Sequence, residues 1–134
     1  MNVPFLIAGT LALTGAAIHG ILGERIVVTK LRLETLPSTQ FGSSRFTKVM
    51  IRATWHITTL AFVVMGSGLL ACAPDASSGA CEGIGRMTAI AYASDTALVI
   101  GLAAPQIRRA RLRHPAPLLF AVVAALSWWG AGRA

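Results

Sequence analysis

Hydrophobic residues fall into four long segments, which are separated by polar or basic stretches. The segments cover approximately residues 3–23, 49–72, 84–104 and 116–132. Each is close to the roughly 20 residues that a helix needs to cross the hydrocarbon core of a bilayer. They are continuous and rich in alanine rather than alternating, which favours helices over a transmembrane β-barrel. The pattern predicts an all-α membrane protein: a single domain of four transmembrane helices in an up-down bundle.

Basic residues lie mostly in or beside the loops that such a bundle places on one side. Only Arg86 and Arg133 lie toward the other side. Because cytoplasmic loops carry an excess of Lys and Arg, loops 24–48 and 105–115 are predicted to be cytoplasmic, with both termini and loop 73–83 outside. We therefore expect a multi-pass protein integral to the cell membrane, typical of a bacterial inner membrane. The residues behind this prediction are Arg25, Lys30, Arg32, Arg45, Lys48, Arg52, Arg108, Arg109, Arg111 and Arg113.

Composition agrees with a surface that faces lipid. Hydrophobic residues make up 54% of the chain and charged residues only 13%, against about 25% charged residues in typical globular proteins. The net charge of +7 follows from the basic loops and suits anionic lipid headgroups. Basic residues do not interleave with aromatic ones, so nucleic acid is not an expected partner. The first segment has no positive n-region, which favours a retained helix over a signal peptide.

The predicted external loop holds the two cysteines of the chain, Cys72 and Cys81. In an oxidising compartment two cysteines in a short loop can form a disulfide. Their spacing is not the C-x-x-C pair of thiol oxidoreductases. A structural bond or two free thiols are therefore preferred over redox catalysis.

Small residues recur at every fourth position in the first and third segments. Such faces let membrane helices approach closely, either within the bundle or between copies of the chain. A homo-oligomer that assembles through these faces is therefore one expectation. The faces are Ala8, Ala12, Ala16 and Gly20 in the first segment, and Ala89, Ala93, Ala97 and Gly101 in the third.

Among the ionisable residues of the predicted spans, His19, His56 and Asp95 lie too deep to be explained by the membrane surface. Ionisable groups in the bilayer are costly and mark candidate sites. At 1.5 Å per residue, all three fall within about 8 Å of one another along the membrane normal. They form the predicted ion, proton or ligand site, and the simpler alternative is a structural hydrogen bond for each. Nearby residues that could support the site are Glu24, Arg52, Thr59 and Tyr92.

Three functions are compatible with this pattern. Histidine exchanges protons near neutral pH, so the first is a proton- or ion-handling membrane protein. The second is metal or haem binding through His19 and His56, since imidazole suits Zn, Cu and Fe. The third is a non-catalytic subunit whose polar residues set the helix register. The sequence contains neither a recognisable Ser-His-acid combination nor a phosphate-binding glycine loop, so it does not favour an enzyme. It leaves the cofactor and the bound species open.

Overall fold

A computed structural model describes residues 1–40, 42–103 and 115–134 of the chain. Within these ranges the protein is all-α, and the only β-type pairing is an isolated bridge between Thr39 and Gly42. The arginines predicted for the second basic loop lie outside the described residues. The helices are α1 (Val3–Ala17), η1 (Ile18–Gly23), α2 (Glu24–Ile26), η2 (Val28–Lys30), η3 (Leu33–Thr35), α3 (Ser44–Cys72), α4 (Gly79–Ala103) and α5 (Ala116–Ala131).

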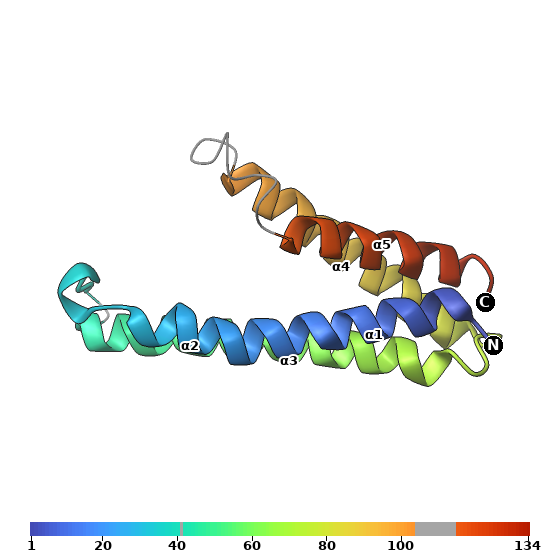
Figure 1. Cartoon of the computed structure of the whole chain (residues 1–134), viewed down its shortest axis with the longest axis horizontal. Coiled ribbons are helices and arrows are strands. Elements are labelled where there is room, and N and C mark those ends of the chain that lie inside the picture. Colours follow the sequence, from blue (N-terminus) through green and yellow to red (C-terminus); the bar gives the residue numbers. More distant parts are fainter. Residues whose placement is uncertain (41, 104–114) are drawn as a thin grey trace.

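Four long helical segments form two hairpins (Figure 1). The run from α1 to α2 packs along α3, and α4 packs along α5. The hairpins meet at the end that holds both termini and the α3–α4 connection, which we call the terminal end. Toward the opposite end of the α1–α3 hairpin, its loop end, they separate (Figure 1).

Small residues bring α1 and α3 together. A Cβ atom on Gly9 would lie 2.8 Å from the carbonyl oxygen of Gly66, and one on Gly66 would lie 3.1 Å from the Cβ of Ala12. Ala8, Ala12 and Ala16 are buried. The first small-residue face therefore packs against other helices of the same chain. Of the second small-residue face, on α4, only Ala89 is buried, and its other three positions are exposed.

The terminal end is held by a buried aromatic ring, a cap and a disulfide. Phe5 is fully buried, and its ring occupies the space that a Cβ atom on Gly85 or Gly130 would need. The Asn2 side chain accepts a hydrogen bond from the Phe5 N–H, which caps α1, and donates one to the Gly130 carbonyl at 2.9 Å. A disulfide joins the last residue of α3, Cys72, to Cys81 in the first turn of α4.

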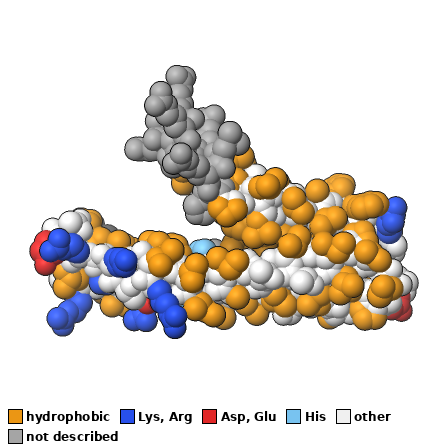
Figure 2. Space-filling view, viewed as in Figure 1, with side chains coloured by type: hydrophobic (Ala, Val, Ile, Leu, Met, Phe, Trp, Pro, Cys, Tyr) orange, Lys and Arg blue, Asp and Glu red, His pale blue; other side chains and the backbone are white. Residues whose placement is uncertain are grey.

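Two helical stretches of the described chain are long and apolar enough to cross a membrane: Val3–Lys30, which is 28 residues long, and Ser44–Cys72, which is 29. Helices of this kind also occur as signal sequences and in soluble cores. The α5 helix is apolar but shorter. Figure 2 shows hydrophobic side chains over most of the hairpin surfaces, while Lys and Arg gather at the loop end of α1–α3.

Candidate functional site

A π-helical segment places His19 against α3. The α1 helix continues without a break into the π-helix Ile18–Gly23, a rare conformation that is frequent at functional sites. Two glycines of this segment admit side chains of α3. A Cβ atom on Gly20 would lie 2.7 Å from Thr59 Cγ2, and one on Gly23 would overlap the Trp55 ring. The absence of side chains here lets α3 approach His19 closely.

The imidazole of His19 is held on several sides. It stacks on the Trp55 indole with the ring centroids 4.2 Å apart, and the edge of Phe62 lies beyond it at 5.9 Å. The Trp55 Nε1 donates a hydrogen bond to the His19 carbonyl at 3.0 Å, and His19 Nδ1 lies 3.0 Å from Thr59 Oγ1. These contacts fix both the position and the rotation of the ring.

The Thr59 hydroxyl lies between two groups, the Trp55 carbonyl at 3.1 Å and His19 Nδ1 at 3.0 Å. A hydroxyl that donates to the carbonyl accepts from a protonated Nδ1, and one that donates to Nδ1 leaves the proton of the neutral ring on Nε2, so both tautomers fit this geometry. In either tautomer the Nε2 atom bonds no group in the described part of the chain.

His56 belongs to a different cluster. The Glu24 carboxylate lies 2.8 Å from Arg52 Nε and 3.3 Å from His56 Nε2, and it joins the end of the α1 run to α3. The Glu24 side chain is 15% exposed, whereas Arg52 is 61% exposed. The sequence suggested Glu24 and Arg52 only as supporting residues. The structure makes Glu24 the centre of this ion-pair cluster.

Asp95 lies on the other hairpin, beyond an aromatic contact. Phe62 of α3 packs against Tyr92 of α4 and Phe120 of α5, with ring centroids 5.1 and 5.4 Å apart. Asp95 follows Tyr92 by three residues and so continues the same face of α4, toward the region where the hairpins separate (Figure 1). Neither the Tyr92 hydroxyl nor the Asp95 carboxylate has a hydrogen-bond partner in the described ranges.

The predicted residues are therefore distributed rather than gathered into one hydrogen-bonded cluster. His19 contacts Thr59, His56 contacts Glu24, and Asp95 makes no hydrogen bond or ion pair with either histidine. Among the described residues there is no group of three or more His, Cys, Asp or Glu side chains arranged to hold a metal. The Nε2 of His56 faces Glu24, whereas the Nε2 of His19 faces no partner in the described ranges.

A groove of about 520 Å³ runs along α3 beside His19. Its lining is mostly apolar and comes from His19, Phe46, Met50, Ile51 and Trp55, together with four threonines. These α3 positions share the helix face that carries Phe62 further along. The groove is thus the wall of the α1–α3 hairpin that becomes exposed where the second hairpin turns away. Sequence reasoning missed it, although Trp55 and the threonines recur on one face of the helix.

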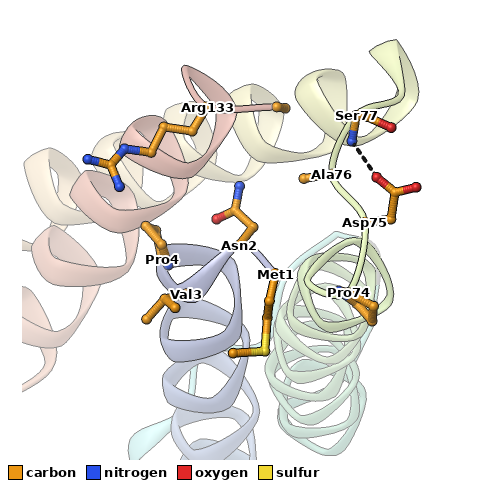
Figure 3. A pocket seen from close by; sticks show the side chains of 10 residues that line it. Met1, Asn2, Val3, Pro4, Pro74, Asp75, Ala76, Ser77 and Arg133 are labelled. Carbon is orange, nitrogen blue, oxygen red and sulfur yellow. Dashed lines mark hydrogen bonds between the residues drawn. The ribbon is translucent and has the colours of Figure 1, made fainter.

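A second cavity, of about 310 Å³, lies at the terminal end between the start of α1, the α3–α4 connection and Arg133 (Figure 3). There the Asp75 carboxylate accepts a hydrogen bond from the Ser77 N–H at 3.0 Å, which lowers the pKa of this carboxyl below its usual value. None of the predicted site residues lines this cavity.

Comparison of the chain with protein-family models, curated proteins and solved structures finds no match. The fold and the side-chain contacts are therefore the only basis for a function.

Proposed function

We propose that the protein spans the membrane four times, with both termini outside, and handles protons or small ions between His19 and Asp95 in the cytoplasmic half of the bilayer. The observation that carries the proposal is the fixed imidazole of His19. Its Nε2 atom has no partner among the described residues, while Thr59 and Trp55 engage the rest of the residue.

Hydroxyl groups on the long helices support the bilayer placement. The side chains of Thr10, Thr14, Thr58 and Thr96 each donate to the backbone carbonyl four residues earlier. Such bonds satisfy polar groups where no water is available. Only 33% and 22% of the apolar windows in the two membrane-length helices are buried, so most of their hydrophobic surface faces outward, unlike that of a helix in a soluble core.

Aromatic and basic residues at the terminal end support a membrane–water interface there. Trp128 and Trp129 of α5 are exposed, and the guanidinium groups of Arg86 and Arg133 lie 5.9 and 4.3 Å from their ring centroids. Tryptophan is enriched at the membrane–water boundary. Its amphipathic ring together with arginine suits an outer headgroup region.

The chemistry of His19 and Asp95 supports proton handling. A neutral imidazole can take up a proton near neutral pH, and a carboxylate inside a membrane span is a typical mark of ion and proton pathways. His19 contacts Phe62, Phe62 stacks on Tyr92, and Asp95 follows Tyr92 by three residues on α4. A connection filled with water or ions between His19 and Asp95 would link the α1–α3 hairpin to α4 of the second hairpin.

Binding of one haem between His19 and His56 is less well supported, because the two rings belong to separate clusters, His19 with Thr59 and Trp55 and His56 with Glu24. A purely structural role remains the alternative. It predicts that His19 matters for assembly alone.

The test is proton flux into liposomes that contain the purified protein, driven by a potassium diffusion potential and followed with an internal pH dye. We expect His19→Gln and Asp95→Asn each to lower the flux at least 10-fold while the proteins remain folded. Leu60→Phe is the control, since Leu60 is 62% exposed. Flux that is absent in the wild type, or equal in all variants, would contradict the proposal.

A further inference from the structure

We propose that the groove beside His19 holds an acyl chain of an anionic phospholipid, whose phosphate lies at the loop end next to Arg45 and Lys48. This goes beyond proton handling. It rests only on the part of the proposed function that places the α1–α3 hairpin across the bilayer with its loop end in the cytoplasm. The lipid then belongs to the cytoplasmic leaflet.

The groove follows α3 from the level of His19 to the loop end. Its lining extends along α3 from Thr58 to Phe46 and reaches Thr39 in the loop. Phe46 and Thr58 are 12 positions apart, which corresponds to about 18 Å along a helix. One leaflet contributes half of the hydrocarbon core, about 15 Å. The groove therefore has the direction and the length of an acyl chain that begins at the cytoplasmic headgroup level.

The lining of the groove suits a hydrocarbon chain rather than a headgroup. None of the lining residues is Asp, Glu, Lys or Arg, and Phe46, Met50 and Ile51 supply apolar surface. The hydroxyl groups of Thr47 and Thr58 already donate to backbone carbonyls, at 2.9 and 3.1 Å. A charged headgroup inside the groove would find no counter-charge, so we place it at the end of the groove.

The end of the groove at the loop carries cations without a carboxylate partner. Arg45 and Lys48 flank Phe46 and Thr47 of the lining along the chain. Arg45 is exposed and forms no ion pair in the described ranges. Lys48 donates one N–H to the Leu31 carbonyl at 2.6 Å, and an ammonium group has two more to give.

The acidic residues of the segment 24–48 do not neutralise these cations. They are Glu24 and Glu34, which form ion pairs with Arg52 and Arg32. Figure 2 shows Lys and Arg side chains gathered at the loop end. Basic residues at a cytoplasmic surface attract anionic lipids. An apolar groove that ends beside such cations therefore fits an amphiphile with an anionic head better than a zwitterionic one.

Fluorescence of Trp55, which lines the groove, tests the proposal. In the background Trp128→Phe/Trp129→Phe, Trp55 is the only tryptophan left. The protein is reconstituted in phosphatidylcholine vesicles that contain increasing fractions of either phosphatidylglycerol or phosphatidylcholine with brominated acyl chains, which quench tryptophan on contact. We expect brominated phosphatidylglycerol to associate about 5-fold or more tightly than brominated phosphatidylcholine, because each nearby cation adds attraction.

Charge variants separate the cations at the groove from the net charge of the protein. Arg45→Gln/Lys48→Gln should bring the two association constants to within about 2-fold of each other, since the local attraction is lost. Arg86→Gln/Arg133→Gln removes the same charge at the terminal end and should leave the preference unchanged. If the first double variant does not fold, Arg45→Gln alone should lower the preference, and Arg45→Lys should keep it.

Several results would overturn the inference. They are equal quenching by the two lipids in the unaltered groove, a preference that survives Arg45→Gln/Lys48→Gln, and a preference that survives Thr54→Phe, which fills the groove. Relief of quenching by soluble glycerol phosphate would assign the cations to a free anion instead. Proton flux without lipid preference would leave the proposed function standing and end this inference, whereas lipid preference without flux would do the reverse.

Discussion

The contact between the π-helix and α3 depends most on Gly23, because this residue has no side chain. A Cβ atom there would overlap the Trp55 ring. Overpacking costs about 1–3 kcal/mol, while alanine gains about 0.8–1 kcal/mol over glycine in a helix. We expect Gly23→Ala to lower the free energy of unfolding in detergent by up to about 2 kcal/mol and to change the near-ultraviolet circular dichroism of Trp55.

Gly83→Ala is the matched control, because nothing lies within 4 Å of a Cβ atom at that position of α4. It should be neutral or stabilising. If Gly23→Ala were as stable as Gly83→Ala, the close packing of Trp55 on the π-helix would be refuted.

At the scale of single residues, the sequence identifies which groups are unusual but not what they touch. The depth of His19, His56 and Asp95 follows from counting residues along helices, and that count suggested one site. Contact depends instead on the rotation of each helix about its axis. The π-helix changes that rotation within α1, and Glu24 then meets Arg52 and His56 on α3. Hydrophobic periodicity alone carries no signal for such a change.

At the scale of elements, the apolar segments mark the helices better than they mark their ends. The α3 helix begins at Ser44, before the apolar segment at 49–72, because its first turns are amphipathic and pair with the loop. Lys48 Nζ, for example, donates to the Leu31 carbonyl at 2.6 Å. The α4 helix begins at Gly79, within the predicted external loop, next to the disulfide.

The Cys72–Cys81 bond connects the two hairpins at the terminal end. For a loop with a sequence separation of nine residues, the chain-entropy model gives a stabilisation of about 2–3 kcal/mol. We expect Cys72→Ser/Cys81→Ser to lower the free energy of unfolding by about that amount. Reductant should shift the unfolding midpoint of the wild type but not that of the double variant. A wild type that contains two reactive thiols before reduction would contradict the bond.

At the scale of the whole molecule, the class of fold was predictable and the arrangement of the hairpins was not. Four apolar segments were enough to predict four helices and an all-α chain. The separation of the hairpins depends on where bulky and small residues meet. Phe5 fits against Gly85 and Gly130 at the terminal end, and Phe62 meets Tyr92 and Phe120 further along. These pairings join residues far apart in the chain, which no local pattern encodes.

The number of membrane crossings is the property of the whole molecule on which the proposals depend. Four crossings place residue 106 in the cytoplasm, whereas crossings by α1 and α3 alone leave it outside with the terminal end. In a Cys72→Ala/Cys81→Ala background, single cysteines at Ser38, Ser78 and Gln106 distinguish these cases. We expect a membrane-impermeant maleimide to label Ser78→Cys on intact cells, and Ser38→Cys and Gln106→Cys only after permeabilisation. The positive-inside bias of the basic loops is the physical reason. Labelling of Gln106→Cys on intact cells would show that the second hairpin does not cross, and the proposed connection between His19 and Asp95 would then lose its α4 wall to water.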